Sequence, residues 1–138
     1  MPNAASLSRA VAALLLAASP LAQATAASYA SEVVAPTVAV RNTPYRAAFP
    51  LLGAPPADGR ITTVYYAWQF SYRPPGLTVK LCQGSRCLDV SKDASGTSAA
   101  FRGLSPSQPF QLHYAVGGSG AIMPLLSGKQ QLAVSYTF

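Results

Sequence analysis

The sequence predicts an all-β fold, a small antiparallel β-sandwich or barrel-like domain. After the N-terminal segment no stretch keeps the apolar period of a helix, while several stretches alternate with period two. About seven short strands follow one another, separated by turns rich in proline and glycine, a spacing typical of small sandwiches and barrels. The two cysteines of the chain flank one tight turn, as the ends of a cross-linked hairpin would.

Residues 1–26 have the pattern of a cleavable signal peptide. Arg9 supplies the positive charge, residues 10–18 form a short apolar run, and small residues at alternate positions place the cleavage near Ala24 to Ala27. The apolar run is far shorter than the roughly 20 residues that span a bilayer. We therefore expect export to the periplasm without stable membrane insertion.

Residues 27–138 are expected to form a single domain of a size that supports a modest core. The whole chain carries a net charge of +6, which falls to +5 once Arg9 is removed with the leader. A basic surface suits anionic partners, but a merely solvated surface is the simpler interpretation. The basic residues are scattered singly, and export leads away from nucleic acid, so no nucleic-acid partner is expected.

The first half of the domain is expected to hold one short and one long strand. Residues 38–40 alternate as a short strand, and residues 42–60 are predicted to be an irregular connection because proline and glycine recur in them. Residues 61–72 are the strongest strand of the chain. Its aromatic row is either the spine of the core or a binding platform, and comprises Tyr66, Trp68, Phe70 and Tyr72, in line with Val64.

Residues 77–82 and 87–90 are predicted to be the two arms of a hairpin. In an exported chain, Cys82 and Cys87 at its facing ends should form a disulfide rather than a catalytic or metal pair. The alternation of the arms places leucine and valine inside and the bridge outside.

The second half of the domain contains a turn and three or four further strands. Three expected strands cover residues 97–101, 110–116 and 121–123, and the third of these ends at Pro124. In the last strand, Leu132, Val134, Tyr136 and Phe138 face one way. A membrane barrel of eight strands of about ten residues each would leave too little chain for loops.

Catalytic chemistry is not indicated. His113, the single histidine, reads as a half-exposed strand residue, and too few ligands surround it in the sequence for a metal site. Asp89 and Asp93 could act as a glycosidase pair only if the fold set them about 5–9 Å apart across a cleft. No nucleophile elbow, zinc motif or dinucleotide fingerprint occurs, so we expect no catalytic residues, metal or cofactor, and binding is the default function.

Several motifs, taken in order behind a signal peptide, resemble the FlhE family of small periplasmic flagellar proteins. The likeness covers roughly residues 60 to 138. The motifs are Ala67-Trp68-Gln69-Phe70, Pro75-Gly-Leu-Thr-Val-Lys-Leu-Cys82 with Ser85-Arg86-Cys87, Gly96-Thr97, Ala100-Phe101-Arg102-Gly103, and Gly117-Gly118 ahead of Ile122-Met123-Pro124.

The resemblance implies a non-enzymatic accessory of flagellar assembly, a chaperone-like or gating protein on the flagellar rod or the type III export apparatus. It implies a role linked to restraining proton leakage through that apparatus. It also carries over Cys82 and Cys87 as a structural disulfide and Arg86 as the basic tip of the hairpin.

Two binding hypotheses follow. In the first, Arg86, together with Ser85 and Lys80, contacts a flagellar rod or export-gate protein, and an edge strand is open to pairing, either the Val38 strand or the Leu132 strand. In the second, aromatic residues of the 61–72 strand, Tyr65 among them, stack on sugar rings of peptidoglycan. A more remote possibility is a hydrolase that uses Asp89, Asp93 and His113.

Overall fold

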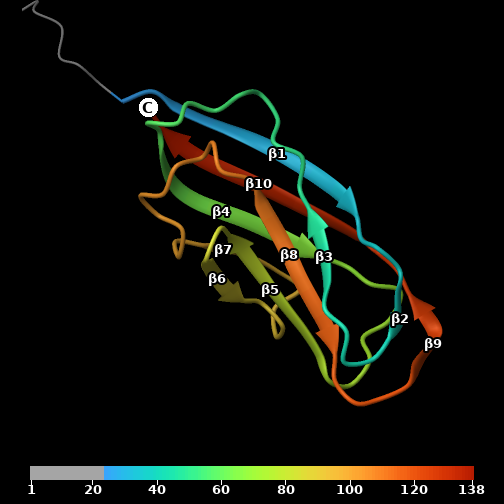
Figure 1. Ribbon diagram of the computed structural model, residues 1–138. Helices are drawn as coiled ribbons and strands as arrows, with labels where there is room; N and C mark the ends of the chain where they lie inside the picture. The colour runs from blue at the N-terminus through green and yellow to red at the C-terminus, as the bar shows by residue number, and fades with distance from the viewer. Residues whose placement is uncertain (1–23) are drawn as a thin grey trace, which may run out of the picture.

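The computed structural model describes residues 24–138, which form an antiparallel β-sandwich and contain no helix (Figure 1). The prediction of an all-β sandwich-like fold is therefore confirmed. No helix in this part of the chain is long and apolar enough to cross a membrane. The ten strands are β1 (Ala26–Val34), β2 (Val38–Val40), β3 (Tyr45–Ala48), β4 (Arg60–Trp68), β5 (Leu77–Gln83), β6 (Arg86–Asp89), β7 (Ser95–Ser98), β8 (Phe110–Val116), β9 (Ala121–Leu126) and β10 (Lys129–Thr137).

Two four-stranded sheets make up the sandwich. The first sheet has the order β1-β10-β4-β7, and the second has the order β3-β8-β5-β6. A two-stranded ribbon of β2 and β9 lies at one end of the molecule, where Figure 1 shows it beyond the ends of the long strands. Every strand pair is antiparallel.

The core lies between the two sheets, and the period-two alternation of the sequence fills it. Residues of β8 alternate strictly between buried and half-buried positions, and β10 does nearly the same. Phe101 and Phe110 are fully buried and pack edge to face, with ring centroids 5.0 Å apart. Such aromatic pairs add to the burial that holds a domain of this size together.

Strand β1 was not expected from the sequence. It pairs with β10 along its whole length, and the pairing continues to Thr25 and Phe138, whose backbone groups exchange two hydrogen bonds of 2.8 and 2.9 Å. Its sequence is dominated by alanine and serine, so it shows little of the β-branched and aromatic character that marks strands. Its first residue falls within the expected leader 1–26, of which residues 1–23 lie outside the described part of the chain.

The expected irregular connection 42–60 contains a strand, which is a correction. Residues Tyr45–Ala48 form β3 and pair with β8, because an edge strand bounded by prolines needs a ladder on one side only. From Phe49 to Gly59 the connection is irregular. It begins beside β1, where the Ser31 hydroxyl donates a 2.7 Å hydrogen bond to the carbonyl oxygen of Pro50.

Three further boundaries differ from the sequence prediction. Strand β4 ends at Trp68 and not at Tyr72, and β7 spans Ser95–Ser98 without reaching Phe101. Strand β9 continues through Pro124, which the ribbon tolerates because only one of its edges is paired. The Leu132 strand is β10, which lies between β1 and β4, so it is not the open edge that was expected.

Candidate functional site

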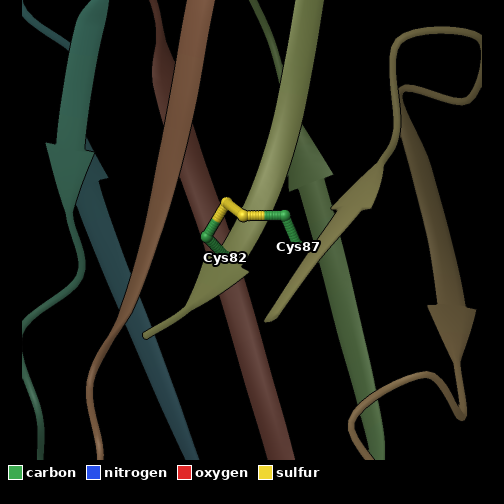
Figure 2. Close-up of a disulfide and its surroundings, with 2 residues drawn as sticks. All are labelled: Cys82 and Cys87. Carbon is green, nitrogen blue, oxygen red and sulfur yellow. A yellow bond between two sulfur atoms is a disulfide. The ribbon is translucent and has the colours of Figure 1, made fainter. Parts of the chain in front are cut away.

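The hairpin of β5 and β6 is closed by a disulfide, as predicted. Figure 2 shows Cys82 near the end of β5 joined to Cys87 in β6. The turn between them is Gly84-Ser85, where Gly84 has a φ of 58° and Ser85 has no positive φ, the pattern of a type II′ turn. In such a hairpin the closing pair, Gln83 and Arg86, exchanges hydrogen bonds, so the cysteines occupy the next, non-hydrogen-bonded position. Their Cα atoms are 4.1 Å apart, which brings the side chains close enough for a bridge.

Ser85 and Arg86 lie together at the exposed tip of this hairpin. The Arg86 guanidinium donates a 3.1 Å hydrogen bond from Nη1 to the carbonyl oxygen of Ala100, at the end of β7. One side of its donor fork is therefore engaged within the molecule. The contact ties the tip to the neighbouring sheet and fixes where the remaining donors point.

Lys80 does not join Ser85 and Arg86. Cross-strand partners share a face of a sheet, and Lys80 pairs with Asp89 on the outer face, two positions from the disulfide. Arg86 pairs with Gln83, which is buried on the inner face. The three residues assigned to partner binding from the sequence are thus divided between two faces.

The register of the second sheet brings together a row that the sequence did not reveal. Arg46 of β3 lies opposite His113 of β8, and His113 lies opposite Lys80 of β5. Asp89 of β6 completes the row. These residues lie far apart in the sequence, and only the pairing register could have placed them side by side.

Asp89 and His113 are not direct neighbours in the second sheet. Hydrogen bonds from the side chain and backbone of Ser91 lower the pKa of the Asp89 carboxyl, with smaller contributions from Lys80 and Lys92. Asp89, the last residue of β6, is therefore stably ionised, and Lys80 separates it from His113 in the row. Within residues 24–138 no group of three or more histidine, cysteine or acidic residues is placed to hold a metal ion.

The aromatic residues of 61–72 are mostly taken up inside the molecule. Tyr66 and Trp68 are only 6% and 4% exposed, and the indole N–H of Trp68 donates a 2.9 Å hydrogen bond to the Val90 carbonyl. Phe70 and Tyr72 follow the end of β4 and are half-buried against the core. Tyr66 and Trp68 therefore offer no ring face to a large ligand, while Phe70 and Tyr72 keep part of their surface exposed.

Tyr65 is the exception in this strand, because its side chain is 42% exposed on the outer face of the first sheet. An open groove of about 410 Å³ runs beside it, and Leu52, Ala30 and Ala133 are among the residues that line it. The groove is mainly apolar in character, with Glu32 as its one charged lining residue.

These features define a class: a small antiparallel β-sandwich with a cross-linked hairpin and basic groups on its surface. The chain belongs to the FlhE family. The family model described as "Flagellar protein FlhE" matches residues 41–137, so the match starts well before the residue 60 at which the motif likeness begins. The expected family membership is confirmed, and FlhE is a family of flagellar proteins, not a known family of enzymes.

Relatives and solved structures agree with this assignment. The flagellar protein FlhE of Escherichia coli K12 is 35% identical over 91 residues, covering 63% of this chain and 68% of the relative. FlhE of Salmonella typhimurium LT2 is 33% identical over the same coverage. A crystal structure of FlhE superposes with a TM-score of 0.72 at 24% identity, covering 80% of this chain and 96% of that one. A chain of the cyanophage Pam1 capsid superposes with a TM-score of 0.56 at 13% identity, covering 88% and 95%, and shares the fold alone.

Proposed function

We propose that this protein is a periplasmic, non-enzymatic regulator of flagellar assembly. It acts as a chaperone-like or gating protein on the flagellar rod or the type III export apparatus. The observation that carries the proposal is that the chain belongs to a flagellar protein family. The side chains that we assign to partner contact, Ser85 and Arg86, are exposed on its surface. Export by the leader of residues 1–26, with cleavage near Ala24 to Ala27, is part of the same proposal.

The hairpin tip is the first contact that we propose for the partner. The disulfide and the Arg86–Ala100 hydrogen bond restrict the tip, so little conformational entropy is lost when a partner binds there. The donors of Arg86 that remain open, beside the exposed Ser85, suit a carboxylate or a backbone carbonyl of a protein.

Crosslinking in flagellated cells tests this contact. A photoreactive residue at Ser85 should capture rod or export-gate proteins from the periplasm, whereas the same residue at exposed Gln131, on the first sheet, should not. Arg86→Glu should reduce the crosslink and swarming, while Arg102→Glu makes the same charge change outside the tip and serves as the control. Unchanged crosslinking and swarming in Arg86→Glu would remove the tip from the proposal.

A peptidoglycan-binding function is the alternative, and it now rests on Tyr65 and its groove. Muropeptides should then bind the wild-type protein and lose affinity for Tyr65→Ala. Absence of muropeptide binding to the wild-type protein would dismiss this alternative and leave the flagellar proposal intact.

A further inference from the structure

We propose that the outer face of the second sheet binds an acidic segment of a partner protein through Arg46, His113 and Lys80. These three side chains stand in one register row across β3, β8 and β5. The proposal deepens the proposed function by naming the chemistry of the partner. It concerns a face different from the hairpin tip.

The side chains of the two cations of the row form no ion pair within 4 Å and no hydrogen bond in the described chain, although Lys80 lies across from Asp89 and helps to lower the pKa of its carboxyl. Five other basic residues have a partner there. Lys129 forms an ion pair with Glu32, Arg73 lies over the ring of Trp68 at 4.7 Å, and Arg41, Arg60 and Arg86 donate hydrogen bonds to backbone carbonyls. The side chains of Arg46 and Lys80 form no hydrogen bond or ion pair within residues 24–138.

Lys92 and Arg102 are the other two basic residues of the described chain without such a contact. They lie in separate turns, so neither stands beside another unpaired cation in a strand register. The row is therefore distinguished by position and not by charge alone, and Lys92 and Arg102 provide a matched control.

The spacing of the row suits a pair of carboxylates. Neighbouring strands are about 4.8 Å apart, so the row spans roughly 10 Å from Arg46 to Lys80. A shallow hollow of about 180 Å³ adjoins the His113–Lys80 part of the row, and Pro44, Thr78 and Ala115 also line it. Two carboxylates about 6–7 Å apart, as on alternate residues of an extended chain or one turn of a helix, fit between the three basic groups. Arg46 can hold one of them with two parallel hydrogen bonds.

The outer face of the second sheet suits a protein better than a membrane surface. Peripheral membrane binding needs apolar side chains that enter the acyl boundary in addition to basic groups. None of the large exposed apolar residues of the described chain lies on β3, β5, β6 or β8. They are Val34, Val40, Leu51, Leu52, Tyr65, Met123, Leu125 and Phe138. A polar, basic and nearly flat face of this kind suits a charged protein segment.

Asp89 limits the part of the row to which such a segment can bind. It occupies the fourth place of the row, next to Lys80 and opposite the Arg46 end. Its carboxylate repels a bound anion there, so the acidic groups are held between Arg46 and Lys80.

Binding of a fluorescein-labelled octaglutamate peptide at low ionic strength tests the proposal with the intact protein. We expect the amide signals of β3, β8 and β5 around the row to shift in NMR spectra. The double variant Arg46→Glu/Lys80→Glu should bind at least about tenfold more weakly. The control Lys92→Glu/Arg102→Glu, with the same net charge, should lose less than about threefold. If the first variant is poorly folded, Arg46→Gln/Lys80→Gln replaces it and should again bind the peptide more weakly than the control.

Equal losses in the two double variants would show that net charge alone attracts the peptide and would overturn the proposal. Binding to phosphatidylglycerol vesicles in preference to the peptide would overturn it in favour of a lipid surface. The outcome is independent of the hairpin contact. Crosslinks from Ser85 to flagellar proteins, without peptide binding at the row, would refute this inference and leave the proposed function standing.

Discussion

The side-chain amide of Gln130 takes the place of a strand partner for the backbone of Gln69. Its Oε1 accepts a 2.8 Å hydrogen bond from the Gln69 N–H, and its Nε2 donates one of 3.3 Å to the Gln69 carbonyl. Gln130 is fully buried at the start of β10, next to the point where β4 ends. The contact satisfies the backbone just beyond Trp68 and lets the chain leave the sheet there, which explains why β4 is shorter than the aromatic pattern predicted.

Replacing Gln130 should therefore destabilise the domain. Gln130→Leu keeps most of the volume but leaves the N–H and carbonyl of Gln69 without their partner, at a cost of about 1–3 kcal/mol. Urea unfolding measures the difference. Gln131→Leu, on the exposed neighbouring position, should change stability by less than about 0.5 kcal/mol. Equal effects of the two substitutions would contradict the role given to Gln130.

Gly128 should tolerate no side chain. A Cβ atom at this position would overlap the carbonyl oxygen of Gln69 and come within 2.9 Å of the Phe70 Cα, both of them backbone atoms. Gly128→Ala should cost about 3 kcal/mol, the upper end for overpacking, because backbone must move. Gly117→Ala is the matched control, since the nearest atom to its Cβ would be 3.8 Å away. Thermal unfolding of the two variants should separate them clearly.

Removing the disulfide should weaken the protein without unfolding it. The ring that it closes is short, with a sequence separation of 5, and the chain-entropy relation gives about 2 kcal/mol for such a loop. Cys82→Ser/Cys87→Ser should lower the free energy of unfolding by about that amount in urea, and reductant should then have no further effect. A fully unfolded double variant would mean that the bridge contributes much more than loop entropy.

Trp68 should report a core environment. It is the single tryptophan of the chain and is nearly inaccessible to solvent. Its emission should be blue-shifted and resist quenching by acrylamide, and muropeptides should leave it unchanged. Trp68→Phe should cost about 1–3 kcal/mol, because buried volume is removed and the Val90 carbonyl keeps only the 3.3 Å hydrogen bond from the Asp93 N–H. Strong quenching in the native protein would be incompatible with the buried position.

Stability should fall at alkaline pH. Burial, together with the charge of nearby Tyr136, raises the pKa of Tyr29 to about 12, and burial raises the pKa of Tyr114 well above its usual value. Unfolded tyrosine titrates near pH 10, so above that pH the folded state holds protons that the unfolded state has released. The stabilisation is complete below pH 10 and is lost as pH rises towards 12, by up to about 1.4 kcal/mol per pH unit for each group.

Urea unfolding between pH 8 and 11, with and without Tyr29→Phe, measures this dependence. The variant should show a shallower decline than the wild-type protein, because one of the two groups is absent. Identical slopes would show that Tyr29 ionises equally in the folded and unfolded states.

The sequence alone determined the fold class, the disulfide, the inward face of β5, and the family. Each of these depends on local information: the period-two alternation, the cysteine spacing around Gly84-Ser85, and short motifs. The alternation of Val64, Tyr66 and Trp68 places these side chains on one face of their strand, and the structure shows that this face is buried in the core.

Tertiary structure decided the rest. Strands β1 and β3 form because β10 and β8 offer them unpaired backbone groups. Their own alanine-rich sequences do not predict strands. The end of β4 depends on Gln130, 62 positions from Trp68 along the chain. The row of Arg46, His113 and Lys80 arises in the same way. Its members meet only through the strand register, and register is a relationship between distant segments that no local pattern contains.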